Sequence, residues 1–200
     1  EIVKGLDAKG LVFLYAVPWP AQGLYSKKAI NSVADLKGLK FRAYNSATIR
    51  IAELTGMAPT KIEAAEISQA FSTGAVESMI TSPTTGKNSK IWENGVGYFY
   101  DIAAWFPKNM VIVNKDSWNK LDAATQKLIM KEAEIAERKG WDLSKKGNVA
   151  DKKALADAGM KVGKVNSALQ KHFQKVGATM ADEWKAKAGS RGASVLAAYK

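Results

Sequence analysis

The sequence contains no cysteine, so it can form no disulfide, no thiolate metal site and no cysteine nucleophile. Its single histidine, His172, has no second histidine or cysteine with which to build a metal site or a catalytic triad. No glycine-rich phosphate loop follows any predicted strand. Because of these absences, no residue of the sequence can be named as the catalytic residue of an enzyme. We therefore expect a protein that is not an enzyme and has no catalytic residue, no metal and no cofactor.

A long hydrophobic run is also missing. A membrane-spanning helix needs about 20 consecutive apolar residues. The most apolar stretch, residues 11–24, is interrupted by Pro18 and Pro20. We therefore expect no direct insertion into a membrane. The sequence begins with Glu1 instead of an initiating methionine, and no targeting signal is visible in it, so we expect the chain to be a piece of a longer protein.

Acidic residues are few relative to basic ones. Lys and Arg number 30 against 19 Asp and Glu, which gives a net charge of +11. Most of the excess lies after residue 105, and such a basic half could attract nucleic acid or an anionic membrane. The lysines are scattered through periodic helices with few interleaved aromatic residues, which favours solvated helix faces instead. We expect no nucleic-acid partner.

What the sequence does contain is typical of an α/β protein. Hydrophobic residues make up 46% and charged residues 24%, as in globular chains. Expected strands at 39–42, 59–63 and 77–81 alternate with expected helices at 47–55 and 66–73, which predicts a parallel sheet. A strand is also expected at 11–17, and the segment 18–26 is predicted to be a loop because it contains two prolines and a glycine.

The last part of the chain is predicted to be mainly helical. Asp122 is a good cap for a long helix, and a helical pattern resumes at 152–158 before Gly159. A short strand at 160–162 precedes an amphipathic helix at 165–188, and Gly189 begins a break.

Arg42 is the first candidate for a binding residue. It stands near the end of an expected strand, just before the polar turn at Tyr44 and Asn45. Ligands of open α/β sheets bind at the carboxyl ends of the strands, and a guanidinium there is placed to grip a carboxylate. Asn45 or Ser46 can cap the following helix, whose N-terminus would lie near Arg42. Thr81 and Ser82 end another strand at the same edge.

The stretch 35–42, Asp-Leu-Lys-Gly-Leu-Lys-Phe-Arg, resembles the signature of the extracytoplasmic solute-binding proteins of TRAP transporters, the DctP-like family. Further stretches resemble this family in the same order: 22–25, 56–59, 66–77 and 113–118 followed by Leu121 and Gln126. The resemblance covers nearly the whole chain. It implies a two-lobed periplasmic solute-binding fold with mostly parallel sheets flanked by helices, long C-terminal helices, and the N-terminal part of one lobe missing.

The resemblance also implies domains and partners. Residues 14–105 would form the ligand-binding lobe that contains Arg42. Residues 1–13 and 106–200 would form remnants of the first lobe, a hinge strand and the C-terminal helices. The implied function is a periplasmic receptor that binds a small organic acid through an arginine clamp and delivers it to the membrane permease subunits of a TRAP transporter.

The ligand site implied by the resemblance is anchored by Arg42, which would pair with the substrate carboxylate. Gln22 matches a position where some members carry a second arginine, and Thr81 one where an amide is common. Trp19 and Trp105 suggest aromatic walls and a compact keto, hydroxy or aromatic acid. The expected ligand-binding residues are Arg42, Asn45, Gln22, Thr81, Ser82, Trp105 and Trp19. The alternatives are a basic nucleic-acid-binding or other anion-binding module, and an enzyme that acts on small acids.

Overall fold

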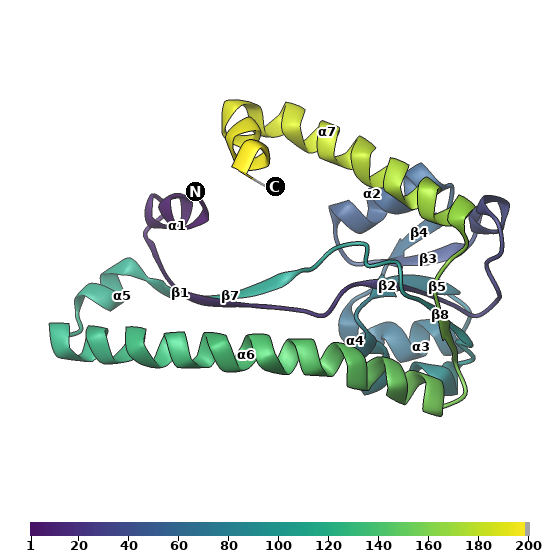
Figure 1. Cartoon of the computed structure of the whole chain (residues 1–200), viewed down its shortest axis with the longest axis horizontal. Coiled ribbons are helices and arrows are strands. Elements are labelled where there is room, and N and C mark those ends of the chain that lie inside the picture. Colours follow the sequence, from purple (N-terminus) through teal and green to yellow (C-terminus); the bar gives the residue numbers. More distant parts are fainter. Residues whose placement is uncertain (199–200) are drawn as a thin grey trace. The chain divides into compact units, whose positions relative to one another are not determined.

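The computed structural model describes residues 1–198 and shows a mixed α/β protein (Figure 1). The chain divides into two compact units, which we describe separately. Unit 1 comprises residues 1–20 and 106–147, and unit 2 comprises residues 21–105 and the chain from Asn148 onwards. The expected lobe bounds, 14–105 against the remainder, stay a prediction. In residues 1–198 no helix is both long enough and apolar enough to span a membrane.

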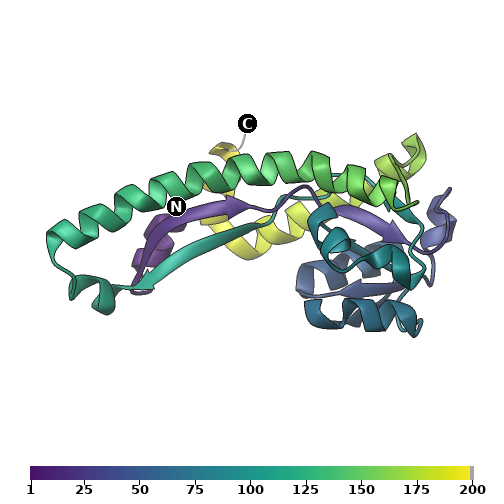
Figure 2. The ribbon, with the colours of Figure 1, turned by 90° about the horizontal axis from the view of Figure 1, so that it is seen from below.

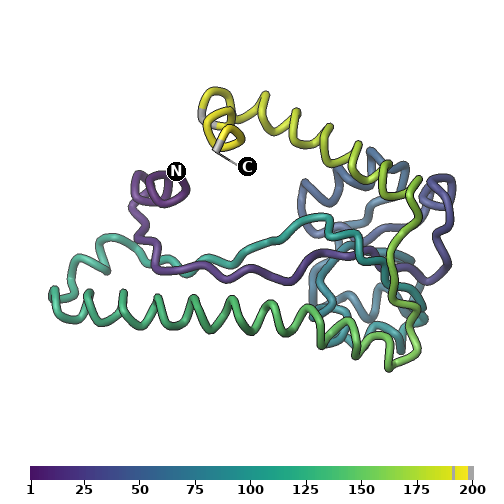
Figure 3. Tube along the Cα trace, in the orientation of Figure 1, coloured from purple at the N-terminus to yellow at the C-terminus, as the bar shows by residue number. Residues whose placement is uncertain are grey.

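Unit 1 is built on an antiparallel pair of strands, which run side by side in Figures 2 and 3. Leu11 pairs with Asn114 at one end and Pro18 with Lys108 at the other. The first half of the long helix α6 packs on this pair, since Gly140 lies against the Val17 side chain and Glu137 accepts a hydrogen bond from the Ala16 amide at 3.0 Å. The elements of unit 1 are α1 (Ile2–Asp7), β1 (Leu11–Pro18), β7 (Lys108–Asn114), α5 (Lys115–Asn119) and the start of α6 (Ala123–Asp157).

Unit 2 contains a six-stranded sheet within the described residues, with the strand order β4-β3-β5-β2-β6-β8. The strands β4, β3 and β5 are parallel, and two helices connect them, as the alternating pattern predicted. The strands are β2 (Gly23–Ser26), β3 (Lys40–Ala43), β4 (Ala58–Lys61), β5 (Ser78–Thr81), β6 (Tyr98–Tyr100) and β8 (Lys161–Gly163).

The strand β2 was not predicted from the sequence. It lies antiparallel between β5 and β6, where the pattern indicated a loop over 18–26. All four of its residues are buried. Gly23 lets the backbone of β2 lie against the Phe99 ring of β6, because a Cβ at this position would lie 2.3 Å from that ring. A glycine beside prolines normally marks a turn, but here it marks tight packing between neighbouring strands.

Helices cover both faces of the unit 2 sheet (Figure 1). On one face, Phe41 and Ala43 of β3 pack with α2 and α7. On the other face, Met79 of β5 packs with α3 and with Leu155 of α6. The helices and helical turns of unit 2 are η1 (Val33–Leu36), α2 (Ser46–Thr55), η2 (Ala64–Glu66), α3 (Ile67–Ser72), α4 (Pro83–Asn88), η3 (Ile91–Asn94), the end of α6 and α7 (Ser167–Ala198).

Helix boundaries largely follow the capping residues in the sequence. Asn45 and Asp122 each accept a hydrogen bond from the backbone three residues later, at 2.9 Å, as expected for N-caps. The helix α2 ends at Gly56, whose φ of 77° is readily adopted by glycine. The helix α6 is continuous where two segments were expected, and α7 contains a kink at Gly189, where a break was expected.

Candidate functional site

The carboxyl edge of the unit 2 sheet brings several of the predicted binding residues together. The strands β3 and β5 are parallel, so Arg42 and Thr81 both lie toward this edge. Because β2 is antiparallel and Gly23 pairs with Thr81, Gln22 also lies there. These three residues therefore come from three consecutive strands of the sheet, in the order β3, β5, β2.

Arg42 is buried, with 4% of its surface exposed. Its Nε donates a hydrogen bond to the Ile62 carbonyl at 2.9 Å, and its guanidinium carbon lies 4.7 Å from the centre of the Tyr44 ring. Among residues 1–198, no carboxylate forms a salt bridge with Arg42. A buried guanidinium normally pairs with an acid, so this environment suits an anionic ligand.

The position of Arg42 follows from strand alternation. Phe41 and Ala43 point into the core on the α2 and α7 face, so Arg42 points to the opposite face beside Met79, its register partner on β5. On its other side Arg42 pairs with Thr60 of β4, and the chain beyond β4 brings the Ile62 carbonyl within reach. One hydrogen bond and one aromatic ring thus fix the orientation of the guanidinium.

Burial lowers the pKa of Arg42 from its ordinary value, because removal from water disfavours the charged form. Nearby Tyr44 and Glu63 act in the opposite sense through their electrostatic interaction with the guanidinium. The ordinary pKa of arginine lies far above neutral, so the group is still a cation at neutral pH.

Asn45 and Ser82 serve first as helix caps. The Asn45 Oδ1 accepts a hydrogen bond from the Thr48 amide, and the Ser82 Oγ accepts one from the Thr85 amide at 3.1 Å. Ser82 is buried, and its carbonyl accepts a hydrogen bond from the Tyr25 hydroxyl at 3.0 Å. Both residues therefore shape the sheet edge through the start of the following helix.

Tyr44 is a residue of this edge that was not selected from the sequence as a ligand contact. Burial raises the pKa of the Tyr44 hydroxyl, while a hydrogen bond with the Trp105 side chain and the charge of Arg42 lower it by smaller amounts. Tyr44 therefore links Trp105 to Arg42. Its place two residues after a strand arginine was the available signal, since alternate residues share a face.

Trp105 and Gln22 are joined through the backbone. The Gln22 amide donates to the Trp105 carbonyl at 3.0 Å, and the Ala104 amide donates to the Gln22 carbonyl at 2.9 Å. Trp19 belongs to unit 1, where its amide donates to the Pro107 carbonyl at 2.7 Å and its surface is 36% exposed. The six other predicted residues all belong to unit 2.

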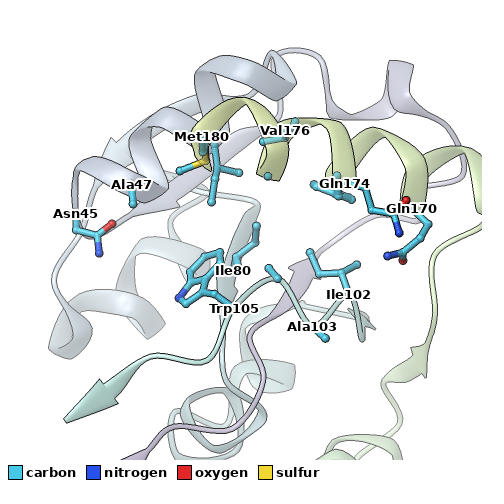
Figure 4. A pocket seen from close by; sticks show the side chains of 14 residues that line it. Asn45, Ala47, Ile80, Ile102, Ala103, Trp105, Gln170, Gln174, Val176 and Met180 are labelled. Atoms are coloured by element: carbon cyan, nitrogen blue, oxygen red, sulfur yellow. The ribbon is translucent and has the colours of Figure 1, made fainter. Parts of the chain in front are cut away.

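Unit 2 also holds a cavity of about 610 Å³ between α2, α7 and the segment after β6 (Figure 4). Its wall is mostly apolar, with Gln170 and Gln174 of α7 as polar groups. Asn45 and Trp105 line it, whereas Arg42 does not, because Arg42 points to the other face of the sheet. The lining residues are Asn45, Ala47, Ile51, Ile80, Ile102, Ala103, Ala104, Trp105, Gln170, Phe173, Gln174, Val176, Gly177 and Met180.

A buried polar network connects the helix α4, which begins at this edge, to the helix α6. Asp151 of α6 is 4% exposed, and it accepts hydrogen bonds from Thr84 at 2.6 Å and Lys87 at 2.5 Å. Both donors belong to α4, the helix that Ser82 caps. The network therefore ties α4 to α6. No group of three or more acidic or histidine side chains suited to a metal ion occurs within the described residues.

Comparison with known proteins identifies the family. The family model for bacterial extracellular solute-binding proteins, family 7 (DctP), matches residues 2–187. The chain therefore belongs to this family, as the resemblance in the sequence indicated. Among curated relatives, the sialic acid-binding periplasmic protein SiaP of Vibrio cholerae is 30% identical over 109 residues, which are 53% of this chain and 33% of that protein. A solute-binding protein of Albidiferax ferrireducens is 25% identical over 188 residues, 92% of this chain and 55% of its own length.

Solved structures confirm the fold. An extracytoplasmic solute receptor of Bordetella pertussis that binds pyroglutamic acid, DctP6, is 41% identical and superposes with a TM-score of 0.95. A TRAP solute-binding protein from a marine metagenome, specific for pyroglutamate, is 38% identical with a TM-score of 0.94. Each comparison covers 99% of this chain and 65% of the other. The expected TRAP solute-binding fold is thus confirmed, and the chain spans about a third to two thirds of the length of these relatives.

Proposed function

We propose that this protein is a periplasmic receptor that binds a small organic acid through Arg42 and delivers it to the permease of a TRAP transporter. The observation that carries the proposal is the environment of Arg42. The guanidinium is almost wholly buried, its Nε is held by the Ile62 carbonyl, and no acid in the described residues forms an ion pair with it. A carboxylate ligand would supply the missing negative charge in bidentate geometry.

The family relatives support this assignment. The two receptors described above bind pyroglutamate, and a TRAP solute-binding protein of Ralstonia eutropha was solved with (S)-2-acetolactate. These ligands are small carboxylates. We propose the same chemical class for this chain, with Thr81, Ser82, Gln22 and Asn45 shaping the edge around Arg42. Trp105 would supply an aromatic wall, and the role expected for Trp19 stays a prediction.

The direct test is a panel of small organic acids, pyroglutamate included, added to the protein encoded by the natural gene. A ligand that binds only the folded state raises the melting temperature. Isothermal titration calorimetry then gives the affinity of each acid that stabilises the protein. No stabilisation by any acid in the panel would contradict the proposed function.

Arg42→Lys tests the residue itself. Lysine retains a positive charge but loses the planar fork and the hydrogen bond from Nε. We expect the affinity for the best acid to fall about ten- to a hundredfold, or roughly 1.5–3 kcal/mol. The matched control is Arg50→Lys, because Arg50 is exposed and pairs with Glu53 and Glu183 on the surface. Equal affinities in the two variants would refute the role of Arg42.

The dependence of binding on salt concentration distinguishes a receptor for an acid from the nucleic-acid-binding alternative. Binding of an acid to a buried arginine should change little with salt, because buried pairs are weakly screened. Association with nucleic acid would instead weaken steeply with salt concentration. Turnover of the acid during the titration would favour the enzyme alternative.

A further inference from the structure

We propose that Asp151 is a positioning residue of the ligand site, which acts without contacting the ligand. Its carboxylate holds Thr84 of α4, and α4 in turn fixes Thr81 and Ser82 at the carboxyl edge of the unit 2 sheet. This inference rests on the proposed function, because it assigns a positioning residue to the same site.

The helix α4 starts directly at the site. Thr81 is the last residue of β5, Ser82 is the N-cap, and α4 begins at Pro83. Thr81 is 6% exposed, and its hydroxyl forms no hydrogen bond with the described residues. The backbone that joins β5 to α4 therefore determines the direction of this hydroxyl. A displacement of α4 would change that direction.

Ser82 depends on α4 more directly. Its Oγ accepts a hydrogen bond from the Thr85 amide at 3.1 Å and lies 3.0 Å from the Thr85 hydroxyl. Its carbonyl accepts a hydrogen bond from the Tyr25 hydroxyl at 3.0 Å. The first turn of α4 therefore determines where the Ser82 hydroxyl points.

Asp151 is the buried polar contact between α4 and α6. It lies in the part of α6 that belongs to unit 2, and 4% of its surface is exposed. Thr84 donates to its Oδ2 at 2.6 Å, and Lys87 donates to its Oδ1 at 2.5 Å. One oxygen thus holds the first turn of α4 and the other holds the last turn. Hydrogen bonds to a carboxylate are about twice as strong as those to a neutral acceptor, so Asp151 restrains the helix firmly.

The helix α4 needs such a restraint because it has only six residues, and an isolated helix of this length is unstable in water. Its close contact with Tyr25 at Gly86 determines how near α4 lies to the sheet. Hydrogen bonds are directional, so the bonds to Asp151 also fix the rotation of the helix about its axis.

Thr84 carries more of this effect than Lys87. The Lys87 side chain is 41% exposed, and exposed partners of ion pairs contribute little. Thr84 is only partly exposed and lies two residues after Ser82. Variants of Thr84 therefore test the inference most directly.

The variants Thr84→Val and Thr84→Ser separate the hydroxyl from the shape of the side chain. Valine keeps the shape and loses the hydroxyl, whereas serine keeps the hydroxyl. We expect Thr84→Val to weaken the affinity for the best acid of the panel about three- to tenfold, as for other effects transmitted through packed elements. Thr84→Ser should change this affinity by less than about twofold.

Titration calorimetry at a temperature where all variants are folded gives these affinities. A purely structural role would lower the urea midpoint of Thr84→Val and leave its affinity unchanged, and this result would overturn the inference. Thr84→Ser that binds as weakly as Thr84→Val would also overturn it. If no acid binds even the protein encoded by the natural gene, the proposed function itself fails.

Thr73→Val is the matched control. Thr73 is exposed, and its hydroxyl donates to the Gln69 carbonyl of its own helix. It follows α3 and precedes β5, so it lies toward the opposite edge of the sheet from Thr81. Its affinity should stay within about twofold of the natural protein. A loss equal to that of Thr84→Val would refute a specific role of the Asp151 contact.

A double variant tests whether Asp151 acts through Thr84. Two residues that share one hydrogen bond are energetically coupled, so their effects on affinity should not add. We expect Asp151→Asn combined with Thr84→Val to bind within about twofold of the weaker single variant. Losses that multiply in the double variant would refute the connection between the two residues.

Amide hydrogen exchange gives a readout that needs no ligand. In Thr84→Val we expect the amides of residues 85–88 to exchange about tenfold faster, while those of α2 change little, because a lost local contact permits local opening. Equal acceleration in α4 and α2 would indicate a general loss of stability and would overturn the inference.

Discussion

Gly86 shows how a single residue determines the packing behind the site. A Cβ at this position would lie 2.3 Å from the hydroxyl of Tyr25 and 2.6 Å from the adjacent ring carbon. Tyr25 is wholly buried, and its hydroxyl donates to the Ser82 carbonyl. The tyrosine cannot retreat without losing this hydrogen bond, so the helix α4 must approach it with a glycine.

We therefore expect Gly86→Ala to destabilise the protein by about 1–3 kcal/mol, because overpacking forces either the ring or the helix to move. Gly177→Ala is the contrasting change. Gly177 lies in α7, and a Cβ added there would meet no atom within 4 Å, so alanine should stabilise the helix by about 0.5–1 kcal/mol. Urea unfolding of both variants measures the difference. A stability loss in Gly177→Ala as large as that in Gly86→Ala would contradict this expectation.

At the site, the sequence predicted Arg42 at the end of a strand because alternation and the polar turn are local signals. It could not predict that the Ile62 carbonyl receives the guanidinium, since that contact depends on parallel pairing with β4. The same pairing of distant segments brings Gln22 to the edge. Local patterns thus select candidate residues, and the sheet order decides which of them meet.

At the scale of elements, the helix α6 holds α4 through one carboxylate. Asp151 accepts hydrogen bonds from both Thr84 and Lys87, and its side chain is almost fully buried. The Lys87 side chain is partly exposed and can reach water if the acid is removed. The contact therefore stabilises chiefly the buried carboxylate of Asp151 and the hydroxyl of Thr84.

Asp151→Asn keeps the size of the side chain but removes its charge. We expect a loss of about 1–3 kcal/mol in the free energy of unfolding, because hydrogen bonds to a buried charged group become weaker. Asp157→Asn is the control on the same helix, since Asp157 pairs with Lys153 on the surface and should change stability by no more than about 0.5 kcal/mol. Thermal or urea unfolding compares the two, and equal effects would contradict the assigned role of Asp151.

Element types followed from the sequence wherever a periodic pattern was long or a capping residue was present. The βαβαβ segment of unit 2, a helix cap at Asn45 or Ser46 and the long helix after Asp122 were all predicted, and the structure gives Asn45 as the cap. The strand β2 was wrongly predicted as a loop, because it has four residues and follows two prolines. Its strand conformation comes from pairing with β5 and β6, which no local pattern encodes.

At the scale of the whole molecule, the titration of Tyr25 makes the free energy of unfolding decrease at alkaline pH. Burial, with a smaller contribution from Asp151, raises the pKa of Tyr25 well above its ordinary value of about 10. The folded state therefore retains this proton at a pH where the unfolded state has lost it. Stability from this group is fully present below about pH 10 and decreases as the pH rises further.

We expect the urea midpoint to fall as the pH is raised above about 10. Tyr25→Phe should be less stable at neutral pH, since the hydrogen bond to Ser82 is lost, but its midpoint should fall less steeply in the alkaline range. The two dependences are compared over the same pH series. Parallel curves for the natural protein and Tyr25→Phe would show that another group causes the alkaline loss.

The strand order of unit 2 also has a consequence for biosynthesis. The sheet is β4-β3-β5-β2-β6-β8, so its last strand, Lys161–Gly163, pairs with a strand more than 60 residues earlier, Tyr98–Tyr100. Pairing between such distant segments forms slowly, because a long loop must close first. Until residue 163 has been synthesised and has left the ribosome, the edge of β6 that pairs with β8 is unpaired. The backbone N–H and C=O groups of this edge can then pair with other chains. Nascent chains that stop before β8 should therefore be the ones most in need of a chaperone.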